Sequence, residues 1–136
     1  MSLDRTSTPD SVLVGEYTNG NDGTDPRMVK YDLDYTTRRL KVDANKVAKG
    51  SWAYCVNIPR MQGAVMANGK VYVSQSEGTI LAGDLWEWTP GSTAQQDLWF
   101  FPKGPEDLSY DKRSGGKLYT VTEHPGSRYI VIKDAP

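Results

Sequence analysis

The feature that most constrains the fold of this chain is an internal repeat. Three segments align without gaps: Val12–Thr18 (VLVGEYT), Val71–Glu77 (VYVSQSE) and Leu118–His124 (LYTVTEH). Each is rich in β-branched and aromatic residues, which is the composition of half-buried strands. Each is followed by a polar turn and a second strand-like run, at 28–31, 85–88 and 129–132. A repeated unit of this kind predicts an array of similar sheets.

Further strand-like segments complete each repeat. Residues 63–66 lead through an Asn68-Gly69 hairpin turn into the second aligned segment, and residues 108–110 precede the third. Fourth strands are expected at 39–42 and 98–101. The unit is thus a four-stranded antiparallel meander, repeated after 59 residues (position 12 to 71) and again after 47 (position 71 to 118). This spacing is typical of β-propeller blades, with a β-sandwich or a plain meander as the alternative.

The repeat predicts an all-β, incomplete propeller of about 2.75 blades. Blade 1 covers 2–43, an inter-blade insertion covers 43–60, blade 2 covers 61–102, and blade 3 covers 105–136 without its outer strand. No helix longer than one turn, at 44–49, is expected. Propellers have about four to eight blades, and unpaired strand edges promote association. We therefore expect the missing blades to come from a second chain or from self-association.

Composition excludes some classes of partner. The formal net charge is −1 and no Lys/Arg stripe is present, which argues against nucleic-acid binding. No apolar run approaches the roughly 20 residues of a membrane-spanning helix. The start, MSLDR, lacks an apolar signal core, so the chain is cytosolic, has lost a signal, or begins inside a longer protein. Cys55 is the single cysteine, which suits either redox compartment.

Three motifs carry a resemblance to a known group of proteins: MQGAV at 61–65, GPEDLSY at 104–110 and TEHPGSRY at 122–129. In their order and spacing they resemble the C-terminal half of secreted, functionally uncharacterised bacterial β-propeller proteins that are common in actinobacteria. The resemblance implies a secreted, extracellular parent protein about twice this length. It implies no activity and no catalytic residue.

Propeller geometry places the candidate site. Loops before the innermost strands, and loops joining second and third strands, lie at the same end, where ligand sites form. The residues expected at that mouth are Arg60, Gln62, Glu106, Asp107 and Glu123. Neighbouring strand residues point to opposite sides, so Glu106 and Asp107 do not form a catalytic pair by themselves. A structural role, in which such a carboxylate accepts hydrogen bonds from backbone amides, competes with catalysis for both.

Two other polar features are candidates for chemistry. His124 is the only histidine, which excludes sites with two or three histidines but leaves an acid–base role or a loop hydrogen bond. The segment Asn19–Asp25 is dense in oxygen ligands, and Asp22 and Asp25 are weak calcium candidates. It lacks the glutamate that ends an EF-hand loop, and a hairpin turn explains it better. No other cofactor is expected.

The aromatic residues suggest carbohydrate binding as a further possibility. Trp52 and Tyr54 lie in the insertion, which could lean over the channel mouth and stack on a sugar. The tryptophans on strands are expected to fill the space between blades instead. These are Trp86, Trp88 and Trp99.

Three functions remain open on this evidence. The first is an exported, non-enzymatic binding propeller that recognises a small molecule, glycan or protein at its mouth. The second is a propeller-type hydrolase or lactonase, and the third is a fragment without independent activity. The enzyme would use residues converging from several blades: Arg60, Gln62, Glu106, Asp107 and His124. No motif joins a nucleophile to a base, which favours binding over catalysis.

Overall fold

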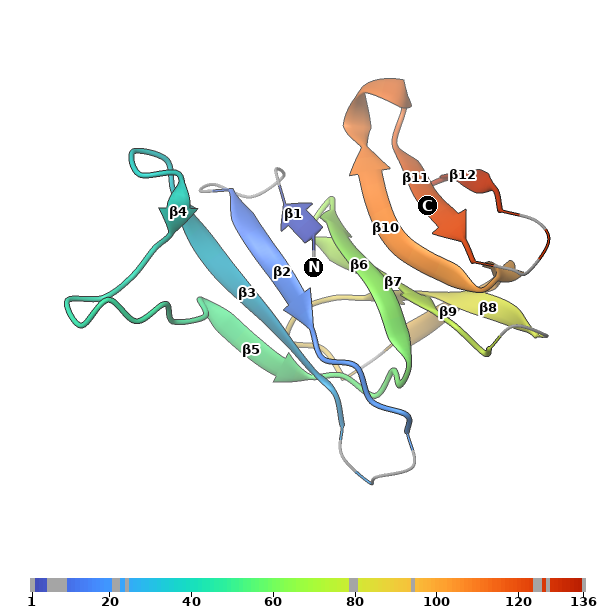
Figure 1. Ribbon diagram of the computed structural model, residues 1–136, viewed down its shortest axis with the longest axis horizontal. Coiled ribbons are helices and arrows are strands. Elements are labelled where there is room, and N and C mark those ends of the chain that lie inside the picture. The colour runs from blue at the N-terminus through green and yellow to red at the C-terminus, as the bar shows by residue number, and fades with distance from the viewer. Residues whose placement is uncertain are drawn as a thin grey trace.

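The computed structural model describes residues 2–4, 10–20, 23, 25–78, 81–93, 95–123, 126 and 128–135. In these residues the chain forms twelve β-strands and one 3₁₀ turn, η1 (Lys112–Ser114), arranged as three antiparallel sheets (Figure 1). The prediction of an all-β, antiparallel architecture is confirmed. The segment at 44–49 forms a turn, which agrees with the expectation that no helix here exceeds one turn.

The first sheet has the order β1 (Ser2–Asp4), β2 (Ser11–Gly15), β3 (Arg27–Asp34) and β4 (Arg39–Leu40). A fifth strand, β5 (Trp52–Cys55), pairs with the first half of β3, next to the part that pairs with β4. The sequence analysis assigned these four residues to an insertion and expected no strand there. The long edge of β3 explains the difference, because β4 covers only its last two residues and leaves the rest available for pairing.

The second and third sheets are simple meanders. The second has the order β6 (Met61–Ala67), β7 (Lys70–Gln75), β8 (Ala82–Trp88) and β9 (Gln95–Lys103). The third has the order β10 (Pro105–Asp111), β11 (Lys117–Thr122) and β12 (Ile130–Asp134). The expected Asn-Gly hairpin turn joins β6 to β7, with positive φ at Asn68 and Gly69 as a type I′ turn requires.

Two hydrophobic clusters hold the three sheets together. On β7, Val71 and Val73 belong to the cluster shared with the first sheet, whereas Tyr72 belongs to the cluster shared with the third. The alternation follows from the period of two in a strand. The second sheet is therefore apolar on both faces and lies between the other two.

The first strands of the three sheets are neighbours. β6 contacts both β1 and β10 (Figure 1). A Cβ atom at position 63 would lie 2.4 Å from the Leu108 amide nitrogen, so glycine is required where β6 and β10 meet. This packing brings the starts of β6 and β10 together at one end of the molecule.

Among the described residues, none belongs to a helix with the length and apolarity needed to cross a membrane.

Candidate functional site

Arg60, immediately before β6, joins loops from two sheets. Its backbone nitrogen donates to the Thr18 carbonyl of the first sheet at 2.8 Å, and its carbonyl accepts from Ser76 at 3.3 Å. Its Nη2 atom donates to both carboxylate oxygens of Glu77, at 2.8 and 2.7 Å. The residue has a φ of 56°, the left-handed region that is uncommon for a non-glycine residue. The loops after β2 and β7 thus meet at this one arginine.

Two buried polar atoms at this junction lack partners among the described residues. They are the Thr18 Oγ1 hydroxyl and the Arg60 Nε nitrogen. The Arg60 side chain is 37% exposed, so the guanidinium reaches solvent while its Nε does not. A buried polar atom without a hydrogen bond costs free energy, so this junction is locally destabilised, as strained functional sites often are.

Gln75 supports the segment that leads to Arg60. Its Nε2 atom donates to the Pro59 carbonyl at 2.9 Å, and its Oε1 atom accepts from Trp86 Nε1 at 2.6 Å. Sequence reasoning did not single out Gln75. The sequence does contain one signal for Gln75, because it ends a strand whose other side chains are mostly apolar. A polar residue in such a strand is informative, since polar side chains are seldom buried.

Glu106 and Asp107 lie in an irregularity at the start of β10, where the pairing register with β11 shifts between Pro105 and Leu108. The Ser74 hydroxyl donates to the Glu106 carbonyl at 2.9 Å, and the Thr120 hydroxyl donates to the Asp107 carbonyl at 2.8 Å. The Asp107 carboxylate accepts from the Leu108 amide at 2.9 Å. This bond is the backbone role that sequence analysis offered as the alternative to catalysis.

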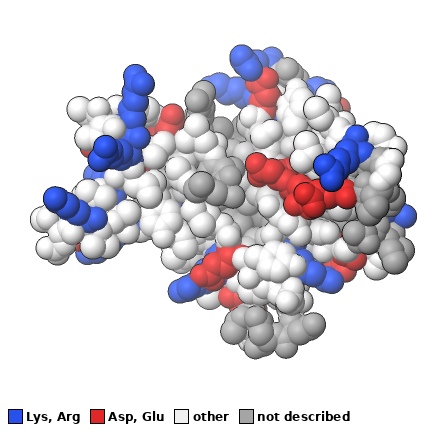
Figure 2. Space-filling model, in the orientation of Figure 1, with Lys and Arg blue, Asp and Glu red and all other residues white. Residues whose placement is uncertain are grey.

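The Glu106 side chain is half-buried and lies within the electrostatic influence of a second carboxylate. Burial raises the pKa of Glu106, and the negative charge of Glu123 raises this pKa further. Glu123 is held nearby because its amide donates to the Gly104 carbonyl at 2.9 Å. Figure 2 shows acidic side chains grouped over the region of the third sheet, with basic side chains beside them. Two carboxylates of like charge that lie near each other favour a cationic partner.

The raised pKa of Glu106 predicts a pH dependence of stability. The unfolded chain ionises this carboxyl near 4.5, and the folded chain ionises it only at higher pH. Ionisation therefore destabilises the fold progressively as the pH rises from about 4.5 through the raised pKa. Glu106→Gln should be more stable than the native chain at neutral pH and should lose that advantage below pH 4.5. Urea unfolding of both proteins between pH 3.5 and 8 measures the difference.

Glu16 is the matched control for this experiment. Its hydrogen bond with Arg27 lowers the pKa of Glu16, so ionised Glu16 stabilises the fold above the unfolded pKa. Glu16→Gln should be less stable than the native chain at neutral pH, and that deficit should close as the pH falls. Parallel pH profiles for the two variants would show that Glu106 is not desolvated.

The remaining candidates at this end are arranged around the same strand starts. Gln62 is half-buried at a register shift between Met61 and Gly63, so β6 and β10 both begin with an irregularity. Such bulges redirect side chains and are common beside functional sites. Gly83 packs between the end of β7 and the start of β10, since a Cβ there would lie 2.6 Å from the Gln75 carbonyl oxygen and from Pro105.

Trp52 and Tyr54 take part in an aromatic cluster instead of standing alone. Their rings lie 5.4 Å apart, and the Trp88 ring lies edge-on at 5.9 Å from Trp52 and 5.7 Å from Tyr54. Trp88 is buried, and its Nε1 atom donates to the Ser92 carbonyl at 2.9 Å. These contacts pack β5 of the first sheet against the second sheet. Trp86 also packs there, as expected for strand tryptophans.

Some predicted residues fall outside the structural description or in open positions. His124 and Asp22 are not among the described residues, nor is the side chain of Trp99. Asp25 is exposed, and no group of three or more His, Cys, Asp or Glu side chains within the described part of the chain is placed to hold a metal ion. Cys55 is an exposed free thiol.

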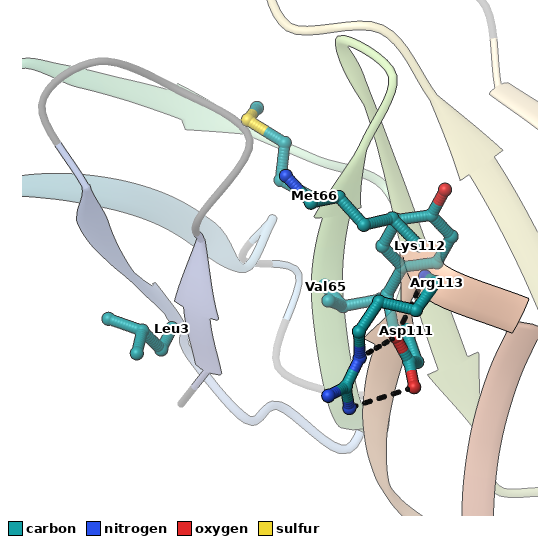
Figure 3. Close-up of a pocket in the computed structure, with 7 residues that line it drawn as sticks. Leu3, Val65, Met66, Asp111, Lys112 and Arg113 are labelled. Atoms are coloured by element: carbon teal, nitrogen blue, oxygen red, sulfur yellow. Dashed lines mark hydrogen bonds and ion pairs between the residues drawn. The ribbon is translucent and has the colours of Figure 1, made fainter. Parts of the chain in front are cut away.

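A cavity of about 360 Å³ lies at the opposite end of the first strands (Figure 3). It is lined by Leu3, Val65, Met66, Tyr110 and the segment 111–113. In Figure 3 the Asp111 carboxylate binds the Arg113 side chain, which leaves this charged pair neutralised. The cavity therefore shows that β1, β6 and β10 also converge at this end, but it offers less unpaired charge than the Glu106 end.

Comparisons of the chain with protein-family models, with curated proteins and with solved structures each found no match. The likeness to secreted bacterial propellers remains a prediction from the sequence motifs.

Proposed function

We propose that the three sheets are blades of a β-propeller and that the chain is a non-enzymatic binding module of an exported protein. Three features support the propeller. Each sheet contains a meander whose first strand lies at one edge, and these edge strands are neighbours. The second sheet is covered by a neighbouring sheet on each of its faces. Radially repeated meanders packed face to face are the propeller architecture.

The binding site of this module is the end at which β6 and β10 begin. The observation that carries the proposal is that an arginine and two carboxylates come together at this end. Arg60 ties two loops together and keeps a buried Nε without a partner among the described residues. The charge of Glu123 raises the pKa of Glu106, so two carboxylates lie near each other at this end. A rigid scaffold with convergent polar groups at loop ends is the usual form of a ligand site.

The ligand class follows from these charges. A small molecule, glycan or protein segment that presents an ammonium group to Glu106 and Glu123 would relieve their repulsion. A neutral or anionic acceptor on the same ligand would accept from the solvent-exposed part of the Arg60 guanidinium. Hydrogen bonds to charged groups contribute about 1.5–3 kcal/mol each. The site should therefore prefer an amino sugar or another polar amine over its neutral analogue.

A titration of the isotopically labelled chain with glucosamine, and with neutral N-acetylglucosamine, tests the proposal. Glucosamine should shift the amide resonances of 104–107 and 123, and Glu106→Gln should weaken its binding at least tenfold. Asp134→Asn, which removes a carboxylate at the far end of the third sheet, should leave binding unchanged. Equal shifts with both sugars, or no shift at 104–107, would contradict a cation-selective site.

A propeller-type hydrolase or lactonase is the second candidate. The observation that favours it is the raised pKa of Glu106, because a carboxyl that holds its proton longer than usual can act as a general acid. This candidate requires turnover of a lactone or ester substrate that Glu106→Gln abolishes. Binding of glucosamine without any such turnover supports the binding module instead.

A further inference from the structure

The repeat assigns equivalent positions to the faces of successive sheets. Val71 packs toward the first sheet, and its aligned residue Leu118 packs toward the second. Tyr72 packs toward the third sheet, and its aligned residue is Tyr119. Each sheet therefore has a preceding face and a following face. Two such interfaces, between the first and second sheets and between the second and third, exist within the chain.

The following face of the third sheet has no sheet against it in the described chain. Cross-strand pairing places Tyr119 opposite Ile132 and Val121 opposite Ile130, so all four share this face. Ile130 is 72% exposed, although Leu85, which holds the equivalent register position in the second sheet, is fully buried. A shallow cavity of about 420 Å³ lies on this face, lined in part by Tyr119, Val121 and Ile130. Exposed apolar surface of this kind marks an interaction site.

No sheet of the described residues covers the preceding face of the first sheet either. Register places Leu3 and Tyr31 opposite Val12, so these three share one face with Val14. Leu3 is 44% exposed, and the others are half-buried. The residues aligned with Val12 and Val14 in the second sheet are Val71 and Val73, which are completely buried against the first sheet. The two uncovered surfaces are thus the two halves of an interface that the chain already makes twice.

We infer that two copies of this chain close one ring, with the third sheet of each copy packed on the first sheet of the other. The inference rests on the proposed propeller architecture and adds its completing partner. The same contact occurs twice about a two-fold axis, because the third sheet of each copy meets the first sheet of the other, and this closes the dimer. Propellers have about four to eight blades, and two copies of the three described sheets fall within that range. Two copies give a six-bladed ring.

A second copy of the chain is the partner that fits the two uncovered faces, because the packing between sheets inside the chain can continue between the third sheet of one copy and the first sheet of the other. Inside the chain, Leu85 of a following face meets Leu118 of a preceding face in one cluster. Across the ring contact, the equivalent residues are Ile130 of one copy and Val12 of the other. Both are apolar, as the intrachain pair is, and no charged side chain takes either position.

Sedimentation velocity of the intact chain, combined with charged variants of the two faces, tests the inference. The native chain should sediment as a dimer, at twice 15.1 kDa. Ile130→Glu and Val12→Lys should each sediment as monomers. An equimolar mixture of the two variants should recover a heterodimer, because the altered residues then meet as opposite charges in one contact and the other contact is native. Val47→Glu, at an exposed position on neither face, should remain dimeric.

A covalent test covers the case in which a charged variant fails to fold. In a Cys55→Ser background, Val12→Cys combined with Ile130→Cys should form a disulfide-linked dimer on oxidation, and neither single variant should do so. A folded native monomer at all concentrations, a mixture that stays monomeric, or the absence of the crosslink would overturn the inference. These experiments measure the mass of the particle in solution, whereas the glucosamine titration measures ligand binding near Glu106. Failure of the dimer proposal is therefore distinguishable from failure of the proposed binding function.

Discussion

Gly63→Ala is expected to lower the free energy of unfolding by about 3 kcal/mol or more. The added Cβ would lie 2.4 Å from the Leu108 nitrogen and 2.7 Å from the Asp107 carbonyl carbon. Both neighbours are backbone atoms of β10, so neither can rotate away and the two strands must separate. The separation would expose the cluster between the second and third sheets and shift Glu106. Urea unfolding followed by circular dichroism measures the loss.

Gly15→Ala is the matched control for Gly63→Ala. Its Cβ would meet the terminal methyl group of Met61 at 3.3 Å, and a methionine end is flexible enough to yield. We expect a change below about 1 kcal/mol. Equal destabilisation by the two alanines would show that β6 and β10 are not in the close contact described above.

Trp88→Ala is expected to cost about 3–5 kcal/mol, with a fall of roughly 10–20 °C in Tm. Trp88 is 2% exposed and touches both Trp52 and Tyr54 of β5. Its removal leaves a cavity where the first and second sheets meet, and Tyr54 and Trp52 lose their aromatic partner. Because β5 has few other buried side chains, it should detach from the second sheet. Differential scanning calorimetry measures the first effect, and hydrogen exchange at 52–55 measures the second.

Two variants define the specificity of the Trp88 effect. Trp88→Phe keeps an aromatic ring and should recover part of the stability, although it loses the hydrogen bond to the Ser92 carbonyl. Tyr17→Ala removes an aromatic side chain that is 57% exposed and should change the stability by less than about 0.5 kcal/mol. A Trp88→Ala protein as stable as Tyr17→Ala would contradict the aromatic contact between the sheets.

Local sequence signals predicted most of the strands. The runs aligned at 12, 71 and 118 became β2, β7 and β11, and the Asn68-Gly69 dipeptide made the expected turn. These features are governed by side-chain alternation and turn chemistry, which act within a few residues. The strand β5 was missed because its formation depends on an edge of β3 left open more than 20 positions earlier in the chain.

The candidate site was predicted in outline but not in its contacts. Arg60 and Glu106 were expected at the start of strands, and Glu123 in the loop between a second and a third strand. In the structure Arg60 precedes β6, Glu106 lies at the start of β10, and Glu123 follows β11. The ion pair between Arg60 and Glu77, the support from Gln75 and the repulsion felt by Glu106 were not predicted. Each depends on side chains that are brought together when β6 packs against its neighbours. Such contacts between distant residues cannot be derived from their spacing in the sequence.

What the sequence by itself determined is the kind of unit: apolar alternation and turn residues make antiparallel meanders, because both act through the local backbone. What only the tertiary structure decided is how those units meet. Val71 and Tyr72 are adjacent apolar residues in the sequence, yet one packs on the first sheet and the other on the third. Tyr119 and Ile130 lie on a face of the third sheet that no sheet of the described residues covers. Burial is a property of the assembled faces, so the uncovered surfaces became visible only once the sheets were packed.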